Sequence, residues 1–200
     1  MKKTSVYELA ACAVMAAVLC VLAPMTVPVG PIPVTLATLV LYLSVYVLRT
    51  RSALLSCAIY LLLGAFGLPV FSGWSGGFAK LAGPTGGYLA AYLLLVLISG
   101  LFVTKSYRLS FPESISPRVK ILLSGAFAVL GMLLGTAVLY AFGTAWFMFQ
   151  TKSTLKYALS VCVLPFIAGD LAKIALAAVV GRLLRAALIK AGLLLGDRSL

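Results

Sequence analysis

Two charged side chains stand three residues apart in an otherwise apolar stretch of this sequence. Within FIAGDLAKIALAAVV, residues 166–180, Asp170 and Lys173 are the only charged residues. Residues three apart share one face of a helix, so the two side chains can pair with each other or converge on one ligand. A carboxylate accepts hydrogen bonds from N–H groups, and an ammonium donates them to oxygen atoms. The spacing therefore predicts a small polar site on an apolar element.

The element that carries this pair is expected to lie in a membrane. The chain has 200 residues, of which 63% are hydrophobic and 10% are charged, and its mean hydropathy is +1.16. A soluble domain is about one-quarter charged, so this chain cannot cover a water-facing surface. A charge left alone in lipid costs about 2.5–3.5 kcal/mol, so both charges should face the interior of a bundle. We expect residues 1–200 to form a single integral membrane domain.

Six apolar segments divide the chain, and each is long enough for a membrane helix or nearly so. They cover approximately residues 5–23, 34–48, 52–69, 86–104, 120–142 and 157–184. The sequence therefore predicts an all-α membrane protein with six transmembrane helices. A Gly-rich loop is expected from Pro69 to Thr85, and a connection from Gly143 to Lys156. Pro165 suits the first turn of a helix, which would place Asp170 about 7 Å along that helix at ~1.5 Å per residue.

The basic residues indicate how the chain is oriented. The net charge is +12, but the bases lie in short clusters between apolar runs, as in membrane proteins and not in nucleic-acid-binding domains. If both termini are cytoplasmic, twelve bases fall in inner segments and three in outer loops. The three outer bases are Lys80, Lys152 and Lys156. This bias predicts cytoplasmic termini and a multi-pass protein of the bacterial cell membrane.

Several kinds of chemistry are disfavoured by the residues present. There is no histidine, the four cysteines lie in apolar runs without a CxxC pair, and no phosphate-binding G-x-x-x-x-G-K-[ST] loop occurs. We therefore expect no metal, no cofactor and no enzyme activity, and any active transport would draw its energy from another subunit. Two alternatives stay open. One is a membrane enzyme that uses Asp170 as acid or base beside Lys173. The other is a structural subunit in which the pair only fixes helix packing.

The two predicted outer loops are rich in glycine, proline and aromatic residues. They read APMTVPVGPIPVTLATL and GLPVFSGWSGGFAKLAGPTGGYLAAY. Glycine lets backbone N–H groups approach a ligand closely, and Trp74 and Tyr88 offer apolar rings with polar tips. The alternative is a tight loop with aromatic residues at the membrane interface, which is common in membrane proteins.

Three stretches together resemble one family. GPIPVTLAT (residues 30–38), GGFAKLAGPTGGYLAAY (residues 76–92) and GDLAKI (residues 169–174) occur in order along nearly the whole chain. They are similar to the BioY family, the biotin-binding S components of energy-coupling factor (ECF) transporters. One departure is Ala37, where the family commonly carries glutamine.

The resemblance implies an S-component-like bundle that captures biotin near the outer face. It also implies partners, namely a transmembrane coupling subunit and two cytoplasmic ATPase subunits. Biotin has a polar ureido ring, an apolar thioether ring and a carboxylate tail. We expect Asp170 to accept from a ureido N–H, and Lys173 to donate to the ureido carbonyl or to the tail. The full expected substrate-binding set is Thr35, Trp74, Gly83, Thr85, Gly86, Gly87, Tyr88, Asp170 and Lys173. Another small vitamin is the alternative ligand.

A pair of small residues marks the first apolar segment. Ala13 and Ala17 form an A-x-x-x-A pair, and small residues four apart let helices approach closely in lipid. S components use such a motif on this helix to dock their coupling subunit, so the resemblance implies partner docking here. The alternative is a small face packed inside the bundle.

Overall fold

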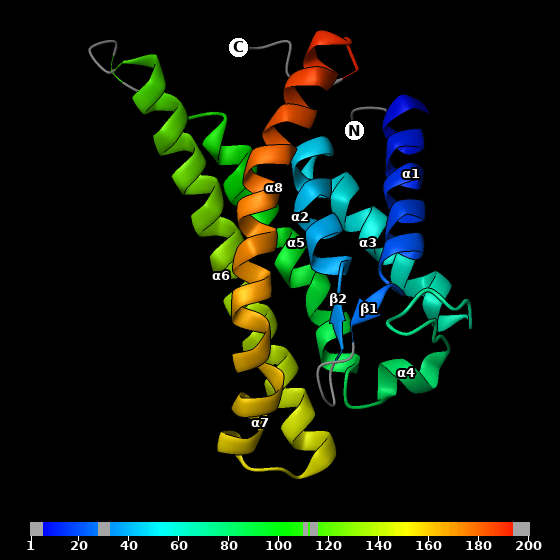
Figure 1. Ribbon diagram of the computed structural model, residues 1–200. Helices are drawn as coiled ribbons and strands as arrows, with labels where there is room; N and C mark the ends of the chain where they lie inside the picture. Colours follow the sequence, from blue (N-terminus) through cyan, green and yellow to red (C-terminus); the bar gives the residue numbers. More distant parts are fainter. Residues whose placement is uncertain (1–5, 28–32, 110–111, 113–115, 194–200) are drawn as a thin grey trace.

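The described part of the protein is mostly helical, as predicted. The computed structural model describes residues 6–27, 33–109, 112 and 116–193 (Figure 1). Its helices are α1 (Val6–Leu22), α2 (Ala37–Val47), α3 (Thr50–Ala65), α4 (Phe78–Ala82), α5 (Gly86–Ser106), α6 (Pro117–Thr151), α7 (Leu155–Cys162) and α8 (Leu164–Lys190). Two short strands, β1 (Thr26–Val27) and β2 (Val34–Thr35), pair antiparallel in the first predicted outer loop.

The first four apolar segments correspond to α1, α2, α3 and α5, but the fifth is longer than predicted. Helix α6 continues to Thr151, so the expected connection from Gly143 to Lys156 is wrong over its first nine residues. A glycine at this point suggested a helix end. In the structure Gly143 is buried within α6, and a Cβ atom there would collide with the ring of Tyr88. The glycine therefore serves close packing of α6 on α5.

The sixth apolar segment is divided into two helices. The prediction of one continuous segment over 157–184 is wrong at Val163, which ends α7 and precedes α8. Pro165 lies in the first turn of α8, as expected. Proline has no N–H to donate to the preceding turn, so a helix that begins just before it loses little, whereas a continuous helix would be broken there.

The Gly-rich loop between Pro69 and Thr85 is also more ordered than predicted, because it contains α4. Before α4 the chain turns through Gly73, Trp74 and Gly77, which have φ angles of 71°, 58° and 90°. Positive φ is ordinary for glycine but uncommon for a residue with a side chain. The tight turn at Trp74 directs this loop back towards α3, where the Gly77 N–H donates to the carbonyl of Gly64 at 2.7 Å.

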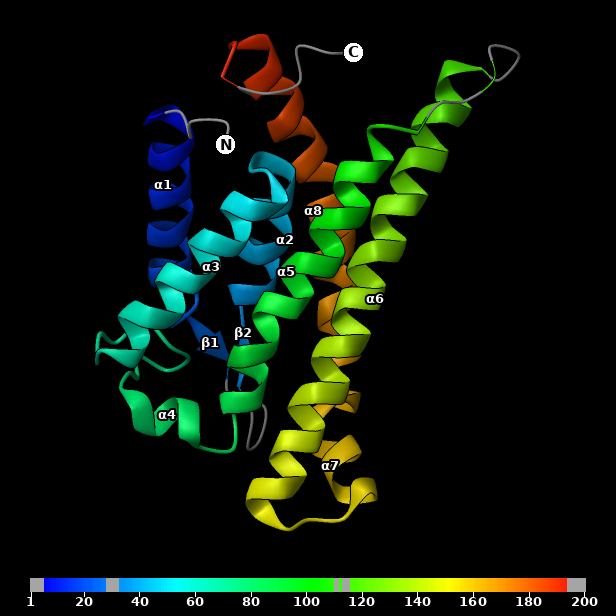
Figure 2. The same ribbon diagram turned by 180° about the vertical axis from the view of Figure 1, so that it is seen from behind.

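Two helix pairs form the main body of the bundle. Helix α5 packs along α6, and α2 packs along α8, with α1 and α3 completing the side next to α2 (Figures 1 and 2). Small residues let the first pair approach closely, since a Cβ atom at Gly131 would meet the side chain of Phe102. Three helical stretches, 86–106, 117–151 and 155–190, are long and apolar enough to cross a membrane, and α1, α2 and α3 are shorter apolar helices. The count of six membrane spans stays a prediction.

The two ends of the bundle differ in the elements they carry. In both views the start of α1 and the end of α8 lie at one end, and α4 and α7 lie at the other (Figures 1 and 2). Two arginines of α8 join helices at the first end. Arg182 donates to the Ile121 carbonyl and the Ser124 hydroxyl of α6, both at 3.0 Å. Arg185 donates to the Tyr46 carbonyl near the end of α2, and a cation there complements the helix dipole.

Candidate functional site

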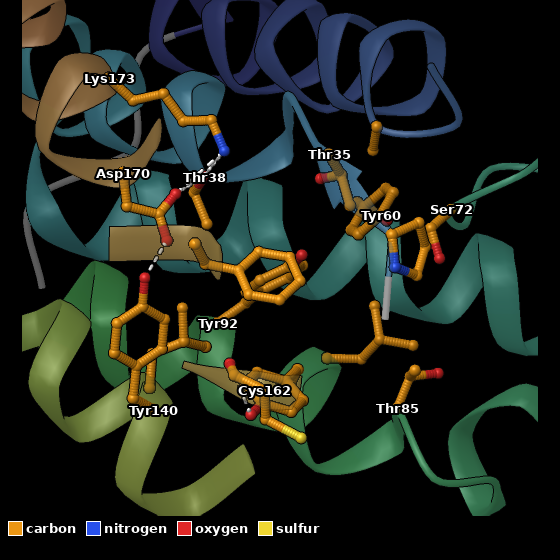
Figure 3. A pocket seen from close by; sticks show the side chains of 16 residues that line it. Thr35, Thr38, Tyr60, Ser72, Thr85, Tyr92, Tyr140, Cys162, Asp170 and Lys173 are labelled. Carbon is orange, nitrogen blue, oxygen red and sulfur yellow. Dashed lines mark hydrogen bonds and ion pairs between the residues drawn. The ribbon is translucent and has the colours of Figure 1, made fainter. Parts of the chain in front are cut away.

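A pocket opens between the helices beside α4 and α7. Its volume is about 650 Å³, a figure that includes the open mouth. Side chains from β2, α2, α3, α5, α6, α7 and α8 line it, together with residues of both loops (Figure 3). The chain therefore brings residues from almost its whole length to this one cavity.

One end of the pocket is charged and hydrogen-bonded. The Lys173 ammonium lies 2.9 Å from Oδ1 of Asp170 and donates to the Thr38 hydroxyl at 3.2 Å. Thr38 in turn donates to the same Oδ1 at 3.3 Å. The Tyr140 hydroxyl donates to Oδ2 of Asp170 at 2.6 Å. Asp170 is buried, so its charge is compensated by an ion pair and by two hydroxyl donors.

The opposite end of the pocket carries neutral hydroxyl groups. Thr35, Ser72 and Thr85 lie there, away from Asp170 and Lys173 (Figure 3). Tyr92 and Cys162 lie between the two ends, and further aromatic and aliphatic side chains complete the wall. The cavity thus offers an ionic end, an apolar middle and a hydroxyl end.

The structure brings together five of the nine predicted ligand-binding residues. Thr35, Thr85, Tyr88, Asp170 and Lys173 all line the pocket. Tyr88 is held in place because its hydroxyl pairs with Thr144 at 3.1 Å and donates to the Cys162 carbonyl at 3.4 Å. Their contact with a ligand stays a prediction.

The remaining four predicted residues are not among those that line this pocket, and their contact with a ligand also stays a prediction. The Trp74 side chain is 63% exposed in the loop before α4. The other three are glycines with a packing role at the start of α5. The Gly83 carbonyl accepts from the indole N–H of Trp146 at 2.9 Å. A Cβ atom at Gly86 would collide with the Leu81 carbonyl, and one at Gly87 with the Trp146 side chain. In the structure these glycines allow α4 and α5 to pack closely against each other and against α6.

Sequence reasoning missed several pocket residues, including Thr38 and Tyr140, which bond directly to Asp170. A hydroxyl in an apolar segment usually has a polar partner, so Tyr140 within the predicted segment 120–142 was a usable signal. Thr38 closes the quoted GPIPVTLAT stretch and offered a similar signal. Ser72 lies in a loop far from α8 along the chain, and nothing in the sequence indicates that it lines the pocket. Residues 30–32 of GPIPVTLAT lie outside the described residues.

Other predicted features can also be located in the structure. Ala13 and Ala17 are exposed on α1, whereas Ala16 between them is 3% exposed and faces the bundle. The A-x-x-x-A face therefore points outward, as partner docking requires. Within the described residues, no group of three or more His, Cys, Asp or Glu side chains could hold a metal ion. The four cysteines are unpaired thiols.

Comparison with known proteins places this fold and pocket in a family. The sequence pattern of the BioY family matches residues 1–190. The chain is 35% identical over 183 residues to the biotin transporter BioY2 of Lactococcus lactis, covering 90% of this chain and 91% of that protein. It is 36% identical over 155 residues to the biotin transporter BioY of Thermotoga maritima, covering 78% and 82%.

A solved structure is similar over nearly the whole fold. The S-component for biotin from an ECF-type ABC transporter superposes with a TM-score of 0.76 at 28% identity, covering 93% of this chain and 94% of that chain. The family pattern over residues 1–190 covers α1 to α8. Sequence and structure therefore agree, and this chain belongs to the BioY family.

Proposed function

We propose that this protein is the substrate-capture subunit of a biotin transporter. Its BioY relatives are biotin transporters, and the similar solved structure is an S-component for biotin. The observation within this chain that carries the proposal is the Asp170–Lys173 pair, with Asp170 buried, at one end of a pocket whose other lining residues are uncharged. The chain is a multi-pass protein of the cell membrane and not an enzyme. Biotin is its ligand, not a cofactor.

The three regions of the pocket match the three parts of biotin. The ureido ring has two N–H donors and a carbonyl acceptor, which suit the Asp170 carboxylate and the Lys173 ammonium. The thioether ring suits the apolar middle. The carboxylate tail then reaches the hydroxyl end, where Ser72 and Thr85 make no side-chain hydrogen bonds within the described residues. We therefore place the ureido ring at the charged end and the tail at the hydroxyl end.

Thermal unfolding of the detergent-solubilised protein tests the ligand. A ligand that binds only the folded state stabilises it by about 2.7 kcal/mol at ~100 times its dissociation constant. Saturating biotin should therefore raise the melting temperature, whereas thiamine and riboflavin at equal concentration should not. A flat response to biotin together with a shift by another vitamin would assign the protein to that vitamin instead.

Biotin amide tests the orientation of the ligand. If Lys173 serves the ureido end, Lys173→Met should weaken binding of biotin and biotin amide by the same factor. If Lys173 held the tail, wild-type protein would bind the amide poorly and Lys173→Met would bind acid and amide alike. Dissociation constants from isothermal titration of all four combinations distinguish the two orientations.

We propose that other subunits supply the energy for uptake. An S component of an ECF-type transporter works with an ECF module, and we propose a transmembrane coupling subunit and two cytoplasmic ATPases as its parts. The exposed Ala13 and Ala17 on α1 offer a small, flat surface where a partner helix can approach closely. Co-purification of tagged protein with these subunits, from cells that express all of them, tests the composition.

A further inference from the structure

Tyr140 occupies a distinctive place in the pocket. It is the only described residue of α6 that bonds to the Asp170–Lys173 pair, and its ring lines the cavity beside them (Figure 3). The bond of 2.6 Å to Oδ2 of Asp170 is short, as expected for a hydroxyl that donates to a carboxylate. Tyr140 therefore connects α6 to the charged end of the site.

The two oxygens of Asp170 are held from different sides of the bundle. Oδ1 accepts from Lys173 of α8 and from Thr38 of α2, two helices that pack along one another. Oδ2 accepts from Tyr140 of α6, which packs mainly on α5. Rotation of the carboxylate about its Cβ–Cγ bond moves both oxygens, so the Tyr140 contact on Oδ2 adds to the restraint that the Oδ1 contacts provide. Helices of both pairs thus hold its plane.

The donors also limit how much of the carboxylate a ligand can use. An ionised carboxylate has about four acceptor positions, and the three donors named above occupy three of them. The remaining position is on Oδ2, next to the Tyr140 hydroxyl. We infer that Tyr140 is a positioning residue, which orients the Asp170 carboxylate so that one acceptor position faces the ureido N–H of the ligand. This inference rests on the proposed binding of biotin.

A double-mutant cycle tests whether Tyr140 acts through Asp170. We expect Tyr140→Phe, which keeps the ring, to weaken biotin binding about tenfold, within the range that coupled residues in contact show. Asp170→Asn should weaken it ~10- to 150-fold, as expected for loss of a charge-assisted hydrogen bond. The double variant Tyr140→Phe/Asp170→Asn should then bind biotin less than ~2-fold more weakly than Asp170→Asn alone. Titration calorimetry gives all four dissociation constants.

Tyr88→Phe is the matched control. Tyr88 also lines the pocket, but its hydroxyl bonds to Thr144 and to the Cys162 carbonyl, not to Asp170. Tyr88→Phe should change the dissociation constant for biotin by the same factor in the wild-type protein and in Asp170→Asn. Melting temperatures of the ligand-free variants show that each is folded. If Tyr140→Phe is unfolded, Tyr140→Met, which fills similar space without a hydroxyl, takes its place in the same cycle.

The outcomes separate the inference from the proposed function. The positioning role would be overturned if Tyr140→Phe weakened biotin binding by the same factor in wild type and in Asp170→Asn. It would also be overturned if Tyr140→Phe left the affinity of the wild-type protein unchanged. Neither result would contradict biotin binding itself. Unchanged affinity in folded Asp170→Asn would overturn the positioning role too, because there would be no carboxylate contact to orient. Only a wild-type protein that does not bind biotin would remove the proposed function itself.

Discussion

Single residues of the GPTGGY stretch carry a role that composition alone does not reveal. Glycines in a loop above a ligand site suggest backbone contacts to that ligand. In the structure Gly87 also packs closely against Trp146, whose indole N–H donates to the Gly83 carbonyl. Because Thr85 and Tyr88 flank this contact and line the pocket, the glycines support the site indirectly.

Substitution of Gly87 tests this packing role. Gly87→Ala should displace Trp146 and destabilise the ligand-free protein, by about 1–3 kcal/mol as for other overpacked sites. The control is Gly169→Ala, next to Asp170 in α8, where a Cβ atom meets nothing within 4 Å. Alanine is favoured over glycine within helices by about 1 kcal/mol, so this variant should be neutral or more stable. Melting temperatures in the same detergent compare the two, and equal shifts would contradict the packing role.

The charged pair could be predicted from the sequence, whereas much of its surroundings could not. Asp170 and Lys173 were identifiable because a charge in an apolar segment is costly and therefore meaningful. Ser72 and Cys162 are small residues without a distinctive spacing, and only the folded chain brings them to the cavity. Loop geometry such as the positive φ of Trp74 likewise has no signature in a single sequence.

At the scale of elements, hydrophobic runs predicted the existence of helices better than their ends. The segments that became α1, α2, α3 and α5 were correct, because long apolar runs between polar breakers have few other stable forms in lipid. The end of α6 was predicted wrongly, because Gly143 packs against Tyr88 and does not end the helix. The sixth segment was predicted as continuous, although the local preference of Pro165 for a first turn correctly indicated where α8 begins.

Helix α1 allows a test of partner docking. Ala13→Trp and Ala17→Trp should leave biotin affinity unchanged and reduce uptake, because a bulky ring on this exposed face prevents close approach of a partner helix. Ala16→Trp is the control, since Ala16 is buried and its substitution should instead lower the melting temperature of the isolated protein. Normal uptake by both exposed-face variants, with normal partner association, would remove the docking role.

At the scale of the whole molecule, the bases still divide between two ends. Lys80, Lys152 and Lys156 belong to the end with α4 and α7, and Arg182 and Arg185 belong to the end where α1 begins (Figure 2). This separation agrees with the orientation expected from the sequence. The cytoplasmic location of the termini stays a prediction, and with it the position of the pocket nearer the outer face.

Cysteine labelling tests that orientation in intact cells. Ser110, a natural choice for the inner side, lies outside the described residues, and exposed Ser116 before α6 replaces it. In a background without the four native cysteines, a membrane-impermeant maleimide should label Ser153→Cys, between α6 and α7, from outside. It should label Ser116→Cys only after the membrane is opened. Labelling of both from outside would contradict the predicted orientation.

The position of the ion pair on a single helix has a consequence for biosynthesis. Because Asp170 and Lys173 are one turn apart on α8, they can neutralise each other within one segment before that segment meets any other. The ribosome makes α8 after the helices that supply Thr38 and Tyr140. The nascent chain therefore acquires the ionic end of its pocket only when α8 enters the lipid.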